Sequence, residues 1–394
     1  MGIVIFGDLF SFPEGDAATN RVHTFAKGFI ENKVNVDVVC FVNEYRNESE
    51  GVNNGIPFYY PFNQKKRSNY FIIRRLHKLQ KYYSAYNLIR KINKREKIAA
   101  INVQTNEHLT HLFSWFLAKS CNAKLVIECC ENPLRHYQEG LLHRRWGILK
   151  FHIEARLCDG VLCISNFLIN FHTSRGINAR KLILVPSTVD PERFLNIGDK
   201  PFDFRYIGYF GALTFLRDNL DLLIKSFADI TNLHPEFRLV LGGFCTEKEK
   251  SEIEELILQL NIEQKVVMLD YMKREEVIRY ISHADILVMV RSKDLDSQAS
   301  FPSKLTEFIA TSKPVITVNV GEIADYFTDG VNAFVVEPEH SDMITEKLNY
   351  VINHYDSALQ VGKKGREMTD TIFNYNYQAK RIIGFIESLN NDEN

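Results

Sequence analysis

One short segment of the sequence places a cation, a carboxylate and a predicted helix start close together. Ser300 is suited to cap a helix and Pro302 to stand in its first turn, so a helix is predicted to begin here. The free backbone N–H groups of Ser303 and Lys304, with the helix dipole and the Lys304 ammonium, would favour a diphosphate. Glu307, one turn further on, would accept hydrogen bonds from ribose hydroxyls. The same spacing also describes an ordinary surface helix with a Lys304–Glu307 ion pair, and spacing alone favours that interpretation.

The elements around this segment alternate between short β-branched runs and longer amphipathic stretches. This alternation predicts βαβ units and parallel sheets covered by helices on both faces. Strands are predicted at 3–8, 36–42, 99–104, 124–129, 160–165, 181–186, 206–211, 237–243, 266–270, 286–290, 314–318 and 333–337. Two sheets of about six strands follow. The expected fold class is α/β, with two doubly wound parallel-sheet domains facing each other across a cleft, where ligands bind beyond the carboxyl ends of the strands.

A change in composition between 190 and 203 marks the predicted domain boundary, because prolines, a glycine and several charged residues interrupt the pattern there. We therefore assign residues 1–195 to an N-terminal domain and 196–372 to a C-terminal domain. Residues 373–394 have helical spacing and no strand follows them. This last segment is expected to form a helix that packs back toward the N-terminal domain.

The composition is that of a packed globular protein. Of the 394 residues, 45% are hydrophobic and 25% are charged, which excludes a disordered or fibrous chain. The net charge of −1 gives no global reason to expect nucleic acid as a partner. The first strand lacks the features of a signal peptide, and no apolar run approaches the ~20 residues of a membrane-spanning helix. Seven cysteines without metal-ligand spacing indicate reduced core thiols of a cytoplasmic protein.

The segment from Lys65 to Lys97 differs from the rest of the chain in charge. It carries twelve Lys and Arg against one acid, Glu96, so its net charge is +11 and that of the remainder is −12. Aromatic and aliphatic residues are interleaved with these charges, as in an amphipathic helix that lies on an anionic membrane surface. A solvated helix face fits the pattern equally well.

Several segments that follow one another in a fixed order carry a family signal. They are Glu14–Arg21, Asp159–Ser165 with 181–194, Gly208–Asp218, Phe301–Ala310 with Ser312–Ile316, and Gly321–Ala333. In this order and spacing they resemble family 4 of the glycosyltransferases, which have the GT-B fold of two Rossmann-like domains. The resemblance implies transfer of a sugar from a nucleoside-diphosphate donor with retention of the anomeric configuration, the donor being held by the C-terminal domain.

The resemblance also implies roles for residues of the C-terminal domain. Glu307 matches the family's ribose-binding carboxylate, and Ser303 with Lys304 matches its phosphate-facing turn. Gly211 matches the first donor-domain turn, and Arg217 lies near the family's cationic phosphate position. Because the departing diphosphate develops negative charge, Arg217 and Lys304 would stabilise it. Without the resemblance, Arg217 is equally a surface residue at a helix start.

In the N-terminal, acceptor-binding domain the implied roles are less defined. Gly15 matches the loop near the diphosphate and the acceptor, although turn geometry alone would also require a glycine. Arg21, Glu131 and His136 are candidate acceptor-side groups. A surface arginine and a loop histidine are the alternatives for Arg21 and His136.

The sequence departs from the family pattern at two positions. Eight residues before Glu307, where the family has a sugar-facing glutamate, stands Ala299. Replacement contacts to the sugar are expected from Asp294, Asp296, Ser297 or Gln298. The arginine that often follows the glycine of the first donor-domain turn is replaced by Ala212. Asp294 and Asp296 also form a DxD pattern, but its late position argues against a metal, so we expect no essential metal and no cofactor apart from the nucleotide-sugar donor.

The leading hypothesis is a retaining glycosyltransferase at the cytosolic membrane face, acting on a lipid-linked or polysaccharide acceptor. Its partners would be a nucleotide sugar, that acceptor and, through Lys65–Lys97, an anionic membrane surface, with no nucleic acid. Two alternatives are a nucleotide-sugar epimerase of the same fold and a non-catalytic subunit that binds nucleotide. No glycine fingerprint for a dinucleotide and no phosphate-binding Gly-Lys-Ser or Gly-Lys-Thr is present.

Overall fold

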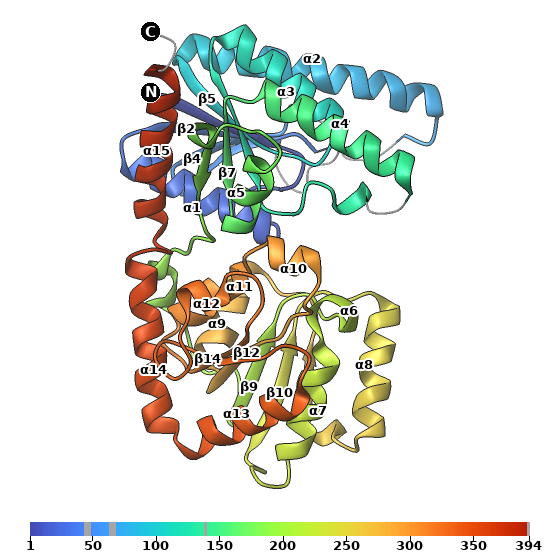
Figure 1. The fold of residues 1–394 in the computed structure, drawn as a ribbon, viewed down its shortest axis with the longest axis vertical. Helices are drawn as coiled ribbons and strands as arrows, with labels where there is room; N and C mark the ends of the chain where they lie inside the picture. The colour runs from blue at the N-terminus through green and yellow to red at the C-terminus, as the bar shows by residue number, and fades with distance from the viewer. Residues whose placement is uncertain (43–48, 63–67, 138–139, 392–394) are drawn as a thin grey trace. The chain divides into compact units, whose positions relative to one another are not determined.

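The structure is a computed structural model, which describes residues 1–42, 49–62, 68–137 and 140–391. The chain divides into two compact units (Figure 1). Unit 1 comprises Met1–Pro186 and Tyr375–Asn394, and unit 2 comprises Ser187–Asn374. Each unit is an α/β body built on a largely parallel sheet, which confirms the predicted fold class of each unit.

The first change of unit lies between Pro186 and Ser187, earlier than the boundary predicted between residues 195 and 196. The Ser187 hydroxyl donates to the Phe301 carbonyl at 3.3 Å. The Val189 amide donates to the Phe373 carbonyl at 2.9 Å. These hydrogen bonds already tie the chain to unit 2. The prediction was late because it followed composition, whereas the tertiary hydrogen bonds decide which unit a segment joins.

The sheet of unit 1 has eight strands in the order β3-β4-β2-β1-β5-β6-β7-β8. Their bounds are β1 Gly2–Gly7, β2 Asn35–Cys40, β3 Glu50–Asn53, β4 Ile56–Tyr59, β5 Ile98–Gln104, β6 Lys124–Cys129, β7 Gly160–Cys163 and β8 Leu182–Leu184. All six strands predicted for this half are present. The remaining pairings are parallel, but β3 pairs antiparallel with β4.

The β3–β4 hairpin is the part of this sheet that the prediction missed. Asn54 and Gly55 connect the strands with φ angles of 49° and 80°. Positive φ at both central residues is the requirement of a type I′ turn, for which Asn-Gly is a strong sequence signal. The prediction looked for longer β-branched runs and overlooked these four-residue strands.

Helices cover both faces of the unit 1 sheet. Their bounds are α1 Ala17–Glu31, α2 Phe71–Arg95, α3 His108–Cys121, α4 Leu141–Leu157, α5 Asn166–Thr173 and α15 Tyr375–Asn391. α1 and α15 share one hydrophobic core with the strands, including Phe25, Phe29 and Ile382. A Cβ added at Gly28 of α1 would lie 2.6 Å from the Ala379 Cβ of α15, so the glycine permits this close packing. α2, α3 and α4 lie side by side in that order, away from α1 and α15 (Figure 1).

Unit 2 contains a six-stranded sheet in the order β11-β10-β9-β12-β13-β14, with every pairing parallel. Its strands are β9 Arg205–Phe210, β10 Phe237–Gly242, β11 Val266–Leu269, β12 Ile286–Met289, β13 Val315–Val318 and β14 Phe334–Val336. All six were predicted. The strand order reverses between β9 and β12, and ligands of doubly wound sheets usually bind beyond the carboxyl ends of the strands at such a switch point.

The helices of unit 2 flank this sheet. Their bounds are α6 Phe215–Asp218, α7 Leu220–Ile230, α8 Glu247–Gln259, α9 Arg274–His283, α10 Leu295–Ala299, α11 Ser303–Ala310, α12 Ile323–Tyr326, α13 Ser341–Asn353 and α14 Tyr355–Glu367. Leu223, Phe227, Ile253 and Leu348 of α7, α8 and α13 join one continuous core with the strands. In the described ranges of both units, no helix combines the length and apolarity needed to cross a membrane.

Candidate functional site

The Lys304 side chain lies beside the switch point of the unit 2 sheet. α11 begins at Ser303, and Lys304 is its second residue. The Lys304 Nζ donates to Tyr209 Oη at 2.7 Å and to Asp218 Oδ1 at 3.1 Å. It also lies 4.5 Å from the centre of the Tyr209 ring. Lys304 therefore joins α11 to the end of β9 and to α6, while 21% of its side chain stays accessible.

Two of the predictions for this helix start are wrong. Pro302 occupies the N-cap position, and no side chain caps α11. Ser300 instead ends α10, where its hydroxyl donates to the Asp296 carbonyl at 2.7 Å. Lys304 and Glu307 also do not form the simple surface pair: Lys304 pairs with Asp218 and Glu307 with Arg193. Local spacing did not anticipate these partners because they lie far away in the sequence.

Gly211 leaves room for the Lys304 ammonium. A Cβ built at Gly211 would lie 2.5 Å from the Lys304 Nζ. The Gly211 amide donates to the Gly242 carbonyl at 2.9 Å, which holds the turn at the end of β9 against β10. A side chain at position 211 would therefore have to displace the lysine.

Asp218 organises the cations around this turn, and sequence reasoning did not single it out. Its Oδ1 accepts from Lys304, and its Oδ2 accepts from the Thr214 hydroxyl at 3.1 Å. Asp218 is buried. The neighbouring Arg217 carbonyl accepts from the Ser292 amide at 2.9 Å, which ties α6 to the segment that follows β12.

Arg291 is a second residue that the prediction missed. It follows the end of β12, is 7% exposed, and donates from Nη2 to the Ser300 hydroxyl at 2.7 Å. Burial lowers the pKa of Arg291, and the nearby Arg217 cation lowers it further. The signal that would have found it is its place just beyond a strand end, the same rule that directed attention to Lys304.

The electrostatics of this cluster favour an additional anion. Burial lowers the pKa of Lys304, while Asp218 opposes that shift and the Arg291 and Arg217 cations add to it. The Arg217 cation therefore lies close enough to Lys304 and Arg291 to disfavour the charge of both. We call Lys304, Arg217, Arg291 and Asp218 the switch-point cluster.

Glu307 lies one turn further along α11 and is paired within unit 2. Its Oε1 accepts from Arg193 Nη1 at 3.1 Å, and both side chains are largely buried. Burial, together with the Arg193 cation, lowers the pKa of nearby Arg274 to about 10. Arg193 was not predicted, because it precedes the expected domain boundary.

The segment expected to compensate for Ala299 forms α10. Ala299 itself is fully buried. Asp294 caps α10, because its Oδ1 accepts from the Ser297 amide and its Oδ2 from the Ser292 hydroxyl, both at 2.6 Å. Although burial opposes ionisation, these hydrogen bonds lower the pKa of Asp294. Gln298 Nε2 donates to the Lys293 carbonyl at 3.4 Å. Asp294 therefore holds the shape of the segment.

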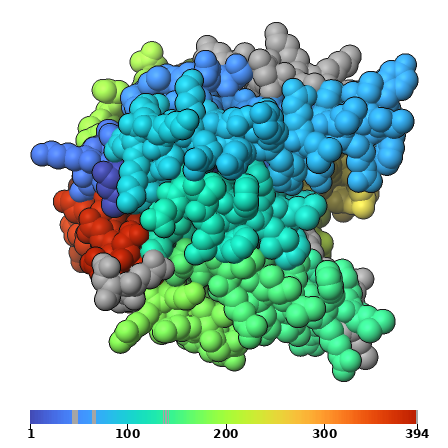
Figure 2. Space-filling model, turned by 90° about the horizontal axis from the view of Figure 1, so that it is seen from above, coloured from blue at the N-terminus to red at the C-terminus, as the bar shows by residue number. Residues whose placement is uncertain are grey.

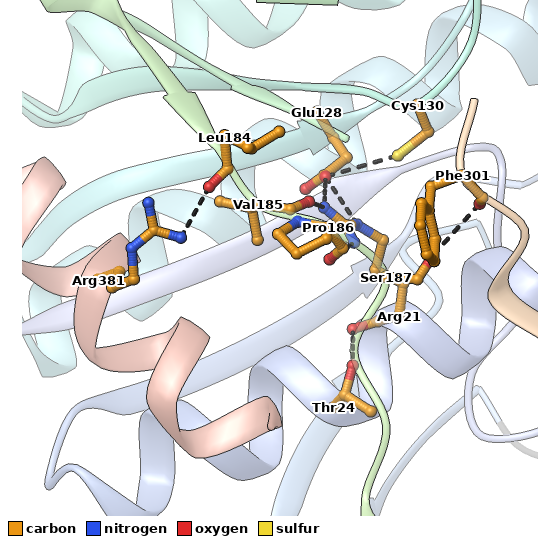
Figure 3. A network of polar contacts seen from close by, with 10 residues as sticks. All are labelled: Arg21, Thr24, Glu128, Cys130, Leu184, Val185, Pro186, Ser187, Phe301 and Arg381. Carbon is orange, nitrogen blue, oxygen red and sulfur yellow. Dashed lines mark hydrogen bonds and ion pairs between the residues drawn. The ribbon is translucent and has the colours of Figure 1, made fainter. Parts of the chain in front are cut away.

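Arg21 of unit 1 belongs to a buried polar network, which Figure 3 shows. Its guanidinium donates to Glu128 at 2.7 Å and to the carbonyls of Pro186 and Val185 at 2.9 and 2.8 Å. Arg381 donates to the Leu184 carbonyl at 2.9 Å. These two arginines anchor the chain that leaves β8 at the end of unit 1, so the geometry gives Arg21 a positioning role.

The other unit 1 candidates are Gly15, Glu131 and His136. A Cβ at Gly15 would lie 2.1 Å from Thr19 Oγ1, so local packing by itself requires this glycine. Glu131 accepts from Arg135 at 3.3 Å. His136 belongs to η1, Arg135–Tyr137, but its side chain lies outside the described residues. Within the described ranges, no group of three or more His, Cys, Asp or Glu side chains could hold a metal ion.

The structure thus brings together three of the predicted residues, Gly211, Arg217 and Lys304, and adds Asp218 and Arg291 to them. Ser303 begins the same helix, and Glu307 lies on it one turn away. This arrangement offers cations for a diphosphate and a carboxylate for a polyol at the switch point of one sheet.

Two family models match the chain. "Glycosyltransferase Family 4" matches residues 18–193, and "Glycosyl transferases group 1" matches residues 192–368. The capsular polysaccharide biosynthesis glycosyltransferase CapM of Staphylococcus aureus is 26% identical over 208 residues, covering 52% of this chain and 51% of that protein. One subunit of the phosphatidylinositol N-acetylglucosaminyltransferase of Arabidopsis thaliana is 22% identical over 277 residues, covering 66% of this chain and 56% of that protein. The matches span about half the length of these relatives.

Solved structures share the fold. The Anabaena protein HepE in complex with UDP-glucose has a TM-score of 0.71 and 15% identity, with 98% of this chain and 100% of that chain covered. The two family matches adjoin near residue 192 and together extend over both units. The chain therefore belongs to the family 4 glycosyltransferases.

Proposed function

We propose that this chain transfers a sugar from a nucleoside-diphosphate sugar to a polysaccharide or lipid-linked acceptor, with retention of the anomeric configuration. The observation that carries the proposal is the switch-point cluster, in which Lys304 pairs with Asp218 beyond the ends of β9 and β12 and the Arg291 and Arg217 cations lie near enough to Lys304 to act on its charge. A bound diphosphate would offset their mutual repulsion. Family membership supports the same chemistry.

The reaction would place the greatest demand on the cations of the cluster. The bond between the anomeric carbon and a diphosphate oxygen breaks, the sugar gains oxocarbenium character, and negative charge develops on the departing group. Lys304, Arg217 and Arg291 would stabilise that charge without reorganising. Ser303 would contribute its backbone N–H, and Glu307 would accept from the ribose hydroxyls.

The names of the similar proteins guide the choice of substrates to test. CapM is named for capsular polysaccharide biosynthesis, the Arabidopsis protein for phosphatidylinositol, and HepE is described with UDP-glucose. We therefore propose a glycan or lipid-linked acceptor at the cytosolic membrane face and a reaction without an essential metal. α2 supports this location, because it carries eight Lys and Arg and no acid. Lys65, Lys66 and Arg67, part of the predicted basic segment, lie outside the described residues.

Thermal unfolding with a panel of nucleotide sugars and nucleoside diphosphates tests the donor site. A ligand that binds the folded chain should raise the melting temperature by mass action. The substitution Glu307→Ala should abolish that rise, whereas Glu254→Ala on the exposed side of α8 should leave it unchanged. If no nucleotide stabilises the wild type, the donor proposal fails.

Product analysis with the stabilising donor then separates the alternatives. Transfer to a lipid-linked or polysaccharide acceptor supports the proposal. Conversion of the donor without an acceptor would identify an epimerase, whereas nucleotide binding without turnover would identify a non-catalytic role. If no metal is required, treatment with a chelator should leave the rate unchanged.

A further inference from the structure

The outer side of α4 carries an apolar stripe that the rest of the described chain does not cover. Leu142, Trp146, Leu149 and Ile153 are all exposed, Leu142 by 83% and Trp146 by 57%. Their spacing of four, three and four residues places them on one face of the helix. A surface helix ordinarily turns such a stripe toward the core. The inward side of α4 is already apolar, because Phe151 and Ala155 pack against Phe171 there.

The first half of α2 repeats this pattern. Ile72, Leu76, Leu79 and Tyr83 have the same spacing of four, three and four residues, and all are exposed, Ile72 by 73%. The residues that α2 buries begin only at Lys81. The N-terminal turns of this helix therefore present apolar side chains to the outside and bury none.

α3 connects the two stripes into one surface. It contacts α2 on one side and α4 on the other. Figure 2 shows the three helices as neighbouring blue, teal and green bands on one face of unit 1. Leu109 and Phe116 of α3 are exposed as well. We call the outer sides of α2, α3 and α4 the three-helix face.

The charge of the three helices that form this face is strongly one-sided. The three helices carry thirteen Lys and Arg and a single acid, Glu154, giving a net charge of +12 against −13 for the remainder of the chain. Glu154 is engaged locally, because its Oε1 lies 2.8 Å from His108 Nδ1. Arg144 and Arg145 are exposed beside the stripe of α4.

We propose that the three-helix face is a docking surface for an anionic lipid bilayer, with Trp146 and the two apolar stripes entering the boundary between headgroups and acyl chains. The sequence pattern indicated only the α2 region; the structure adds α3 and α4 and supplies the aromatic anchor. Amphipathic helices that bind the membrane interface combine Lys and Arg with Trp, Phe and Leu in this way. A protein partner fits less well, because a dense, one-signed charge is unlike the core of a protein interface, where charged residues are depleted, whereas it matches an anionic lipid surface. This inference deepens the proposed function. Membrane binding itself does not depend on that function, but its purpose does, because docking would give access to a lipid-linked acceptor.

Tryptophan fluorescence tests this surface directly, because the chain has two tryptophans, Trp115 and Trp146. In the variant Trp115→Phe, the emission of Trp146 should move to shorter wavelength when vesicles containing phosphatidylglycerol are added. Pure phosphatidylcholine vesicles should give little shift, and added salt should reverse the binding, because screening weakens the attraction of Lys and Arg to anionic lipids. Absence of a shift with the anionic vesicles overturns the proposal.

Matched variants decide whether the stripe is responsible. Leu142→Asp with Leu149→Asp should reduce sedimentation with anionic vesicles by about tenfold. Leu258→Asp on α8, also an exposed leucine, should not. If the α4 double variant and the Leu258→Asp control sediment equally with anionic vesicles, the assignment to α4 is overturned. If the wild type instead forms oligomers without vesicles, and the α4 double variant does not, the face binds a second copy of the chain.

The donor assay separates this proposal from the proposed function. Nucleotide-induced stabilisation of unit 2 should be unchanged in the double variant, which also checks that the variant is folded. Vesicle binding without any nucleotide binding would refute the transferase function and leave the membrane surface in place. Nucleotide binding without vesicle binding would refute the membrane surface and leave the proposed transferase function in place.

Discussion

The Lys304 Nζ lies 3.1 Å from the Asp218 Oδ1, although the two residues are 86 positions apart in the sequence. This ion pair connects the helix start after β12 with the turn after β9, on either side of the switch point. Because it is largely buried, it fixes the position of the lysine more than an exposed pair would. A positive charge is thereby held beside Gly211, where we propose that the diphosphate of the donor binds.

Replacing Asp218 with asparagine should destabilise the chain. The change removes the carboxylate that offsets three neighbouring cations, so we expect the free energy of unfolding to fall by about 2–4 kcal/mol. A saturating nucleoside diphosphate should restore part of that loss. Urea denaturation measures both effects. Asp221→Asn, which removes an accessible i,i+4 partner of Lys225, should change stability by less than about 0.5 kcal/mol. Equal effects of the two substitutions would contradict the role given to Asp218.

Replacing Arg291 with methionine should change stability and ligand binding differently. Burial and the neighbouring Arg217 cation already lower the pKa of Arg291, so removing its charge relieves repulsion in the unliganded chain. We expect stability to change little, while nucleoside-diphosphate affinity falls by about 10-fold to 100-fold. Calorimetric titration and urea denaturation provide the two measurements. Arg291→Lys should retain more affinity than Arg291→Met, and unaltered affinity in Arg291→Met would remove Arg291 from the site.

Gly211→Ala should weaken donor binding by moving Lys304. The added Cβ would lie 2.5 Å from the Lys304 Nζ, so the lysine must shift. We expect a cost of about 1–3 kcal/mol in stability, with a matching loss of nucleotide affinity. Gly384→Ala on α15 is the control, because a Cβ there meets nothing within 4 Å. That helix substitution should be neutral or stabilise the chain by up to about 1 kcal/mol. If Gly211→Ala binds nucleotide as the wild type does, the close approach has no functional importance.

Glu307→Gln should reveal whether this carboxylate recognises ribose. The wild type should bind the preferred nucleoside diphosphate more tightly than its 2′,3′-dideoxy counterpart, because only the former offers hydroxyl donors. The substitution should lower that preference by about tenfold, since hydrogen bonds to a charged group contribute about 1.5–3 kcal/mol. Competition binding measures the ratio. A preference that survives in Glu307→Gln, or that is lost equally in Glu254→Gln, would argue against ribose recognition by Glu307.

His172 should make unit 1 sensitive to acid. Burial lowers the pKa of His172 from 6.5 to about 4, and the Arg175 cation adds to the shift. The unfolded chain therefore binds a proton before the folded chain does. The contribution of neutral His172 to the free energy of unfolding is fully present above pH 6.5 and is lost as the pH falls toward 4. At pH 5 this loss amounts to about 2 kcal/mol.

The variant His172→Phe isolates this effect. His172 packs among aromatic rings, with its ring centre 5.1 Å from that of Phe151, so a phenyl ring suits the site. The stability difference between wild type and variant should grow in the variant's favour between pH 7 and pH 5. Urea midpoints at the two pH values provide the measurement, and a difference that does not change with pH would contradict the lowered pKa.

Local sequence determined the strands, the segment containing Lys304 and Glu307, and the turn at Gly211. Hydrophobic periodicity and strand ends are written in neighbouring residues, so βαβ units and their order are readable from a single sequence. The order of family-like segments likewise identified the glycosyltransferase family before any fold was described. The β3–β4 hairpin was readable too, from Asn54-Gly55, but its short strands were overlooked.

Only the tertiary structure decided which residues share the switch point and where the units change. Asp218, Arg291 and Arg193 acquire their roles from contacts that the folded chain creates. The hydrogen bonds of Ser187 and Val189 place these two residues in unit 2, although the composition changes only after them. The sequence also could not show that the apolar stripe of α4 faces outward. Periodicity shows that a helix has an apolar face, but not whether another element covers that face. Burial and ion pairing depend on residues distant in the sequence, so they are properties of the folded chain.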